Sequence, residues 1–195
     1  MEAGGPGTLH AASDSMSDSI TNKPMPGHPA PALTFDVLGV PESRWDLAKA
    51  EPETFSLLIF YRGLHCPICK TYLQKFDAMF DDFAKLGVEF SALSMDPRER
   101  AEQAMKEWGI DNLPIGYGIA EATARRWGLY ISESIKDGEP RRFNEPGLFL
   151  VRPDGELHYV AINSMPFGRP EPDAMLKAIS FILDEEYPAR GRLAA

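Results

Sequence analysis

The chain has 195 residues, of which 44% are hydrophobic and 25% are charged, and its formal net charge is -9 at pH 7. This composition is that of an ordinary globular protein with one sizeable core, so we expect a single folded domain. The negative charge argues against a nucleic-acid or anionic-membrane partner, because both attract basic surfaces. No apolar run approaches the roughly 18 residues that a membrane span needs.

The two ends of the chain differ in composition from its middle. Residues 1–28 are rich in Gly, Ser, Ala and Pro without apolar periodicity, and we expect them to be disordered. The folded domain is expected over residues 29–188, with a short tail over residues 189–195. The N-terminus lacks a basic region followed by an apolar one, so no secretory signal is visible. We therefore expect a cytoplasmic protein.

The first half of the domain predicts two strands and a helix. Residues 32–38 alternate partly between apolar and polar, as a strand does. Residues 55–61 form a nearly continuous apolar run, which is typical of a strand covered on both faces. Apolar residues then recur at three- and four-residue spacing over residues 69–83, which indicates an amphipathic helix that ends at Gly87.

The second half continues this alternation of strands and helices. Asp96 is the expected N-cap of a helix, with Pro97 at its first position. The remaining predicted elements are strands over 88–95 and 114–119, helices up to Trp108 and over 120–127, a polar loop over 132–144, a hairpin over 147–162 and a final helix over 173–187. This order predicts an α/β fold with a central mixed β-sheet flanked by helices.

The two cysteines of the chain, Cys66 and Cys69, lie together where the second strand leads into the amphipathic helix. In a C-x-x-C at a helix start the two sulfurs lie one turn apart, close enough to form a disulfide. Unpaired backbone N–H groups and the positive end of the helix dipole favour a thiolate there. Cys69 lies on the apolar stripe, so Cys66 is expected to be the more accessible sulfur. Such a pair fits a reducing compartment, where it cycles between dithiol and disulfide.

Several segments resemble known redox proteins. Cys66-Pro-Ile-Cys69, following a strand and opening a helix, resembles the thioredoxin fold and the C-P-x-C site of glutaredoxins. Residues 27–35, 60–61 and 146–169 are similar to the entry strand, the approach to the reactive cysteine and the late hairpin of the AhpC/TSA peroxiredoxin family. The resemblance covers about residues 27–187 and implies a thioredoxin-like fold. Members of the family often dimerise, although a C-x-x-C within one chain does not require a homodimer.

The chain departs from the peroxiredoxin pattern at the site itself. The family pattern P-x-x-x-T-x-x-C, with Cys69 as its cysteine, places Arg62 where proline is expected and Cys66 where threonine is expected. The family also has an arginine just before the Gly-Leu-Phe of the hairpin, where it stabilises the thiolate and the peroxide. This chain has Pro146 there, and in thioredoxins the equivalent residue is a cis-proline that packs against the disulfide.

Other residues are candidates to support the cysteines. His65 precedes the pair and is positioned to favour a thiolate. Three arginines are candidates to replace the missing one, and Arg169 is the best of them because it matches a position of the family; the other two are Arg141 and Arg142. Asp77, Asp81 and Asp82 resemble an acidic cluster, but on an amphipathic helix they are expected to form its solvated face.

Three functions remain open at this stage. The first is a thiol-disulfide oxidoreductase in redox homeostasis, with Cys66 attacking a disulfide and Cys69 resolving the mixed disulfide. The second is a thiol peroxidase that reduces hydrogen peroxide or an organic hydroperoxide, and the family alignment then exchanges the roles of the two cysteines. Both need a cellular thiol reductant of the thioredoxin or glutathione type and no cofactor. The third is a non-catalytic module that senses redox state or binds a metal through the pair.

Overall fold

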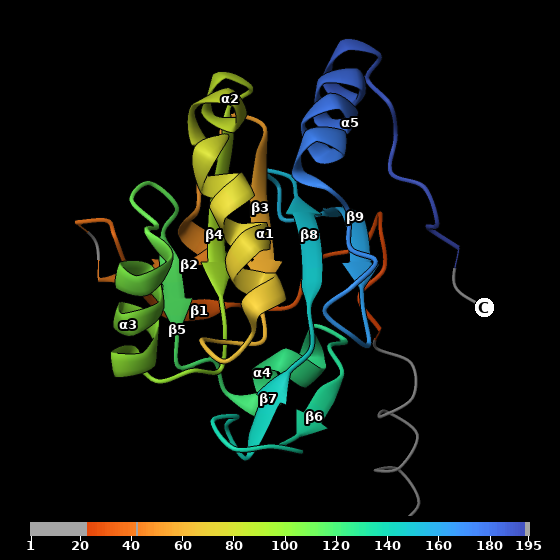
Figure 1. The fold of residues 1–195 in the computed structure, drawn as a ribbon. Coiled ribbons are helices and arrows are strands. Elements are labelled where there is room, and N and C mark those ends of the chain that lie inside the picture. The colour runs from red at the N-terminus through yellow and green to blue at the C-terminus, as the bar shows by residue number, and fades with distance from the viewer. Residues whose placement is uncertain (1–22, 42, 194–195) are drawn as a thin grey trace, which may run out of the picture.

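A computed structural model describes residues 23–41 and 43–193. Its main sheet is mixed and has seven strands (Figure 1). In spatial order these are β2 (Arg44–Asp46), β1 (Thr34–Leu38), β5 (Ile115–Tyr117), β4 (Val88–Leu93), β3 (Phe55–Phe60), β8 (Gly147–Val151) and β9 (Leu157–Ile162). β3, β4 and β5 run parallel, whereas all the other pairings are antiparallel. The sheet is therefore the central mixed sheet expected from the sequence.

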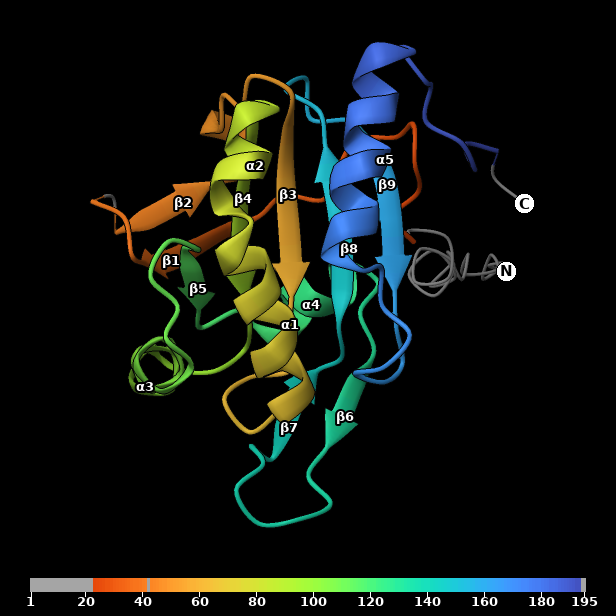
Figure 2. The same ribbon diagram turned by 45° about the horizontal axis from the view of Figure 1, so that its top comes forward.

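The helices lie on both faces of this sheet. They are α1 (Pro67–Ala78), α2 (Phe80–Lys85), α3 (Arg98–Trp108), α4 (Glu121–Arg126) and α5 (Pro172–Asp184), with a short 3-10 turn, η1, over Leu47–Lys49. Figure 2 shows α1, α2 and α5 in front of the sheet and α4 behind it. All six residues of β3 are buried, because a strand at the centre of such a sheet is covered on both faces. In the described part of the chain, no helix is both long enough and apolar enough to cross a membrane.

Three local predictions differ from the structure. The helix expected over residues 69–83 is interrupted at Met79, whose backbone N–H bonds to the carbonyl of Phe76 instead of the residue four positions back. β2 lies between the strands expected over residues 32–38 and 55–61, where the sequence predicted no further strand. The polar loop expected over residues 132–144 instead contains a second, two-stranded sheet of β6 (Ile131–Glu133) and β7 (Arg142–Asn144). Strands of three residues are too short to leave a periodic pattern in the sequence.

The N-terminal expectation falls mostly outside the described residues, since residues 1–22 are not among them. Residues 23–28, however, pack against the domain. The Gly27 N–H donates to the carbonyl of Leu157 at 2.7 Å, and His28 lies 3.1 Å from the carbonyl of Arg192. Backbone bonds to β9 and contacts with the C-terminal segment therefore hold Gly27 and His28 against the domain, and the boundary at residue 28 stays a prediction.

Candidate active site

The two cysteines lie at the carboxyl end of β3, after a loop over residues 61–65. Cys66 is the N-cap of α1 and Pro67 follows at its first position, where a missing N–H costs nothing. Cys69 lies one turn further along, on the buried face of α1. The predicted placement of the pair at the mouth of a helix is therefore confirmed.

Both cysteines are free thiols in direct contact. The backbone N–H of Cys69 donates to the sulfur of Cys66, with 3.2 Å between N and Sγ. Cys66 was expected to be the more accessible of the two, but both residues are buried, with exposed fractions of 1% for Cys66 and 0% for Cys69. Cys66 packs within the same hydrophobic cluster as Tyr61 and Leu64, which come from the loop that precedes it. Only a small reactant can reach such a sulfur without local opening.

The surroundings separate the acidities of the two thiols. A hydrogen bond from the Cys69 thiol, assisted by the Cys69 N–H and by the positive charges of Arg62 and Arg169, lowers the pKa of Cys66 to about 7 against the opposing effect of burial. Burial and the same thiol–thiol hydrogen bond raise the pKa of Cys69 well above its ordinary value. The pair therefore loses its first proton from Cys66, and Cys69 remains a thiol that donates to it.

Arg169 reaches the pair from the loop between β9 and α5. Its Nη1 lies 3.9 Å from the Cys69 sulfur and its Nη2 donates to the carbonyl of Ile68 at 3.2 Å. The guanidinium also stacks on the ring of Tyr72, with 3.7 Å from Cζ to the ring centroid, and the Tyr72 hydroxyl donates to the carbonyl of Pro170 at 2.6 Å. The structure thus brings Arg169 to the cysteines, as its position in the sequence predicted.

Pro146 does not have the cis geometry of the equivalent thioredoxin residue. The described residues contain no cis peptide bond, so the bond before Pro146 is trans and the thioredoxin-type cis-proline is absent. Its carbonyl accepts the N–H of Asn163 at 3.0 Å, which extends the pairing of β8 with β9 by one step. The hairpin register accounts for the position of this proline, which leads directly into Gly147 of β8.

His65 is close to the pair in sequence but is oriented toward the small sheet. Its ring lies against Phe143, with 4.5 Å between the centroids, and neither ring nitrogen has a hydrogen-bond partner. Burial, together with the positive charge of Arg62, lowers the pKa of His65 below its ordinary value. The ring is therefore neutral at pH 7 and does not supply the positive charge for which the sequence made it a candidate.

Sequence reasoning missed two polar residues that fix the loop before the cysteines. The Asp96 carboxylate accepts the Leu64 N–H at 2.7 Å and pairs with Arg100 at 3.0 Å, so it does not cap α3 as predicted. Asn144 on β7 donates to the carbonyl of Tyr61 at 3.1 Å. Both partners belong to residues 61–64, which the sequence alone marks only as a connection. A buried loop needs such partners because its backbone groups are removed from water.

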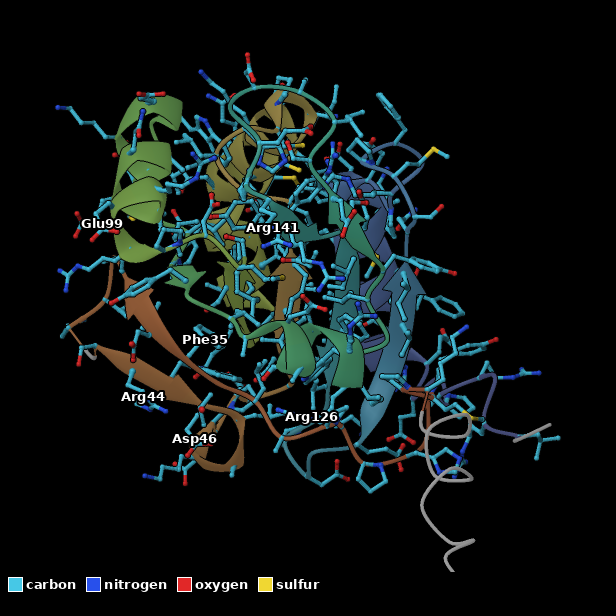
Figure 3. The ribbon with its side chains drawn as sticks, turned by 90° about the horizontal axis from the view of Figure 1, so that it is seen from below. Phe35, Arg44, Asp46, Glu99, Arg126 and Arg141 are labelled. Carbon is cyan, nitrogen blue, oxygen red and sulfur yellow. The ribbon has the colours of Figure 1, made fainter. Side chains whose placement is uncertain are left out.

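The other candidates lie away from the cysteines. Figure 3 shows Arg141 beside the small sheet and Arg126 at the end of α4. Arg142 on β7 forms exposed ion pairs with two glutamates, Glu121 and Glu133. Asp77 accepts two backbone N–H groups of the loop before β5, at 2.8 Å each. Among residues 23–41 and 43–193, no group of three His, Cys, Asp or Glu side chains is arranged to hold a metal ion.

Comparison with known proteins places these features in context. The model of the AhpC/TSA family matches residues 26–160. Peroxiredoxin-2 of Rattus norvegicus is 24% identical over 139 residues, which cover 68% of this chain and 67% of the relative. Thioredoxin peroxidase of Trypanosoma brucei rhodesiense is 27% identical over 166 residues, which cover 80% and 79%. The reduced 2-Cys peroxiredoxin of Plasmodium vivax superposes with a TM-score of 0.67 at 19% identity, over 83% of this chain and 98% of that one.

Proposed function

This chain belongs to the AhpC/TSA family and is a thiol-dependent oxidoreductase, and we propose that it reduces hydroperoxides through the Cys66/Cys69 pair. Several relatives carry the names peroxiredoxin or thioredoxin peroxidase. These names support the peroxidase reading over thiol-disulfide exchange, which the sequence alone placed first.

The observation that carries the proposal is the combination of acidity and enclosure at Cys66. Its thiolate is favoured near neutral pH, because the pKa is about 7, and the residue is only 1% exposed. A hydroperoxide is a small molecule, and only one of its oxygens has to meet the enclosed sulfur. A protein disulfide has to align its S–S bond with the attacking sulfur, which requires more open surface.

The proposed cycle begins with the Cys66 thiolate. It attacks the distal oxygen of the hydroperoxide, an S–O bond forms and the O–O bond breaks. Water or an alcohol leaves after taking up a proton, and Cys66 is oxidised to a sulfenic acid. Cys69 then attacks the Cys66 sulfur, an S–S bond forms, and the hydroxyl leaves as water with the proton of the Cys69 thiol. Two electrons from an external thiol reductant restore the dithiol.

The assignment of roles follows the acidities of the two thiols. Aligning the peroxiredoxin pattern on Cys69 makes that residue the nucleophile, but its raised pKa leaves it protonated at neutral pH. We assign attack to Cys66 and resolution to Cys69. Arg169, beside the Cys69 sulfur, supplies positive charge for the anions that form during both steps.

The remaining parts of the proposal concern partners and compartment. A reductant of the thioredoxin or glutathione type, in the cytoplasm, fits a C-x-x-C pair that must be reduced after each turnover. The pair is complete within one chain, so the cycle proceeds in a monomer as well as in a homodimer.

The test is a single turnover of the reduced protein with equimolar hydrogen peroxide, quenched by alkylation and followed by mass spectrometry. We expect a Cys66–Cys69 disulfide to form orders of magnitude faster than a free-thiol control is oxidised. Cys69→Ser should still react and accumulate a sulfenic acid on Cys66 that dimedone traps, whereas Cys66→Ser should be slow. Oxidation of the wild-type protein at the rate of the free thiol would refute the proposal, and full activity in Cys66→Ser would refute the assignment of roles.

A further inference from the structure

A second arginine, Arg62, lies in the loop that leads from β3 to the cysteines. Its guanidinium forms ion pairs with Glu145 at 3.3 Å and with Glu139 at 3.8 Å. It also lies over the ring of Phe143, with 4.7 Å from Cζ to the centroid. Only 17% of the Arg62 side chain is exposed. The side chain is therefore held at three points in a largely covered position, four residues before Cys66.

Glu145 is itself fixed in place. Its side chain is 4% exposed, and one carboxylate oxygen accepts the hydroxyl of Ser132 at 2.6 Å while the other faces Arg62. Its backbone N–H donates to the carbonyl of Tyr130 at 2.8 Å. Burying an ion pair costs desolvation that its attraction barely repays, so stability alone does not explain why this pair is buried.

The small sheet β6–β7 supplies these partners. Ser132 belongs to β6, Phe143 to β7 and Glu139 to the loop between the two strands, and Glu145 follows β7 directly. The carbonyl of Gly138 in that loop also accepts a hydrogen bond from Arg100 at 3.4 Å. The small sheet thus packs against the loop that precedes the cysteines.

The chain lacks the family arginine that precedes the Gly-Leu-Phe segment, because Pro146 occupies that position. The residue immediately before Pro146 is Glu145, whose carboxylate is negative. The positive charge comes instead from Arg62, which is the partner of Glu145 in the ion pair. Charge that the family places on the hairpin strand is thereby placed on the loop of the cysteines.

We propose that Arg62 is a second anion-stabilising group of the peroxide reaction, and that Glu145 is the positioning residue that aims its guanidinium. Arg62 stabilises the Cys66 thiolate and the oxygen anion that leaves when the O–O bond breaks. This inference rests on the proposed function and adds a residue that the sequence marked only as a departure from the family pattern.

The ionisable groups around Cys66 and its loop come from five parts of the fold. They are Arg62 and His65 on that loop, Cys69 on α1, Arg169 before α5, Asp96 and Arg100 at the start of α3, and Glu139 and Glu145 beside β7. Arg62 and Arg169 act on the charge of Cys66 in the same direction. Removing one of these two arginines therefore lowers the reactivity of Cys66 without abolishing it.

The first measurement is the rate of alkylation of Cys66 by iodoacetamide as a function of pH, which reports the thiolate without peroxide. Loss of a nearby positive charge in Arg62→Met should raise the midpoint by about one pH unit, so the rate at pH 7 falls about fivefold and the rate at pH 10 is unchanged. The matched control is Arg142→Met, which removes an arginine that pairs with two glutamates on the outer side of the same sheet and should leave the profile unchanged.

The second measurement is the rate of the peroxide reaction at pH 10, where Cys66 is fully ionised in every variant. Arg62→Met should remain about tenfold slower than wild type there, because the leaving oxygen has lost a stabilising charge. If leaving Glu145 unpaired prevents folding, the double variant Arg62→Met/Glu145→Leu removes both charges and should show the same loss.

Glu145→Gln separates positioning from simple charge balance. It removes an anion, so by charge alone the alkylation midpoint should stay or fall and the peroxide reaction should not slow. A positioning role predicts instead that the peroxide rate at pH 10 falls about threefold without a rise in the midpoint. An unchanged or faster rate would refute the role of Glu145.

If the alkylation and peroxide profiles of Arg62→Met or of the double variant equal those of the wild type, the role of Arg62 is refuted. Failure of the wild-type protein to react with peroxide faster than a free thiol would instead refute the proposed function. The alkylation profile would still report the effect of Arg62 on Cys66, so the two failures are distinguishable.

Discussion

Gly63, in the loop before the cysteines, offers a sharp test of how this loop is held. Its φ is +120°, and a Cβ atom there would lie 2.6 Å from Oδ2 of Asp96 and 2.8 Å from Oδ1. The carboxylate cannot retreat freely, because it is 1% exposed and bonded to the Leu64 N–H and to Arg100. Gly63→Ala therefore has to displace either the carboxylate or the loop.

The expected cost has two parts. The backbone conformation costs an alanine about 1–3 kcal/mol, and weakening the hydrogen bond to the charged carboxylate costs about 1.5–3 kcal/mol. We expect the free energy of unfolding to fall by about 3–5 kcal/mol, measured by urea denaturation of the reduced protein. The control is Gly109→Ala, at φ +62° with nothing within 4 Å of the added Cβ, which should cost about 1–2 kcal/mol.

A double-mutant cycle isolates the steric part. In an Asp96→Ala background the carboxylate is gone, so Gly63→Ala should cost only its backbone part, about 1–3 kcal/mol. An equal cost of Gly63→Ala in both backgrounds, or a cost no larger than that of Gly109→Ala, would show that the contact with Asp96 does not restrain the loop.

Three further predictions concern the rest of the domain. The pKa of Cys66 in the folded protein is about 7 against an ordinary 9.0, so between these pH values the unfolded state binds more protons than the folded state. The free energy of unfolding of the dithiol form should therefore rise by ~2 kcal/mol from pH 7 to 9. Urea titrations across this range should show no such rise in Cys66→Ser, and a flat wild-type profile would contradict the assignment. Asp77→Ala should lower the free energy of unfolding by ~2 kcal/mol, because it leaves two backbone N–H groups without their acceptor, whereas the exposed Asp81→Ala should change it far less; equal losses in urea denaturation would speak against this role. Trp127→Ala should cost ~3–5 kcal/mol, because its side chain is 0% exposed, and Trp45→Ala, which removes a half-buried ring, should cost clearly less in the same assay.

Long apolar patterns in the sequence predicted most of the fold. β3 and β4 are buried runs whose composition admits little else, and the stripe after the cysteines predicted α1. The small sheet was missed because β6 and β7 have three residues each and are fixed by contacts with distant parts of the chain. Trp45 is only half-buried and stacks on Phe35 at 5.0 Å, because β2 lies at the edge of the sheet.

The site was predictable where chemistry depends on neighbours in sequence. The spacing of Cys66 and Cys69 places both sulfurs in one helical turn, and family resemblance identified Arg169. The partners that shape the loop were not predictable, because Asp96 resembles an N-cap and Glu145 an ordinary surface residue. The signal for Arg62 was its replacement of a proline, and only the fold shows which residues surround it.

The contact between Cys66 and the first turn of α1 also affects how well the enzyme resists inactivation by excess peroxide. The two thiols share a hydrogen bond within one turn of the helix, so in the proposed cycle we expect the disulfide to form without unwinding of the helix. A sulfenic acid on Cys66 would then be consumed before a second peroxide molecule can convert it irreversibly to the sulfinic acid. Such a protein would lose little activity per turnover even at high peroxide concentration, because its two cysteines are only one helical turn apart.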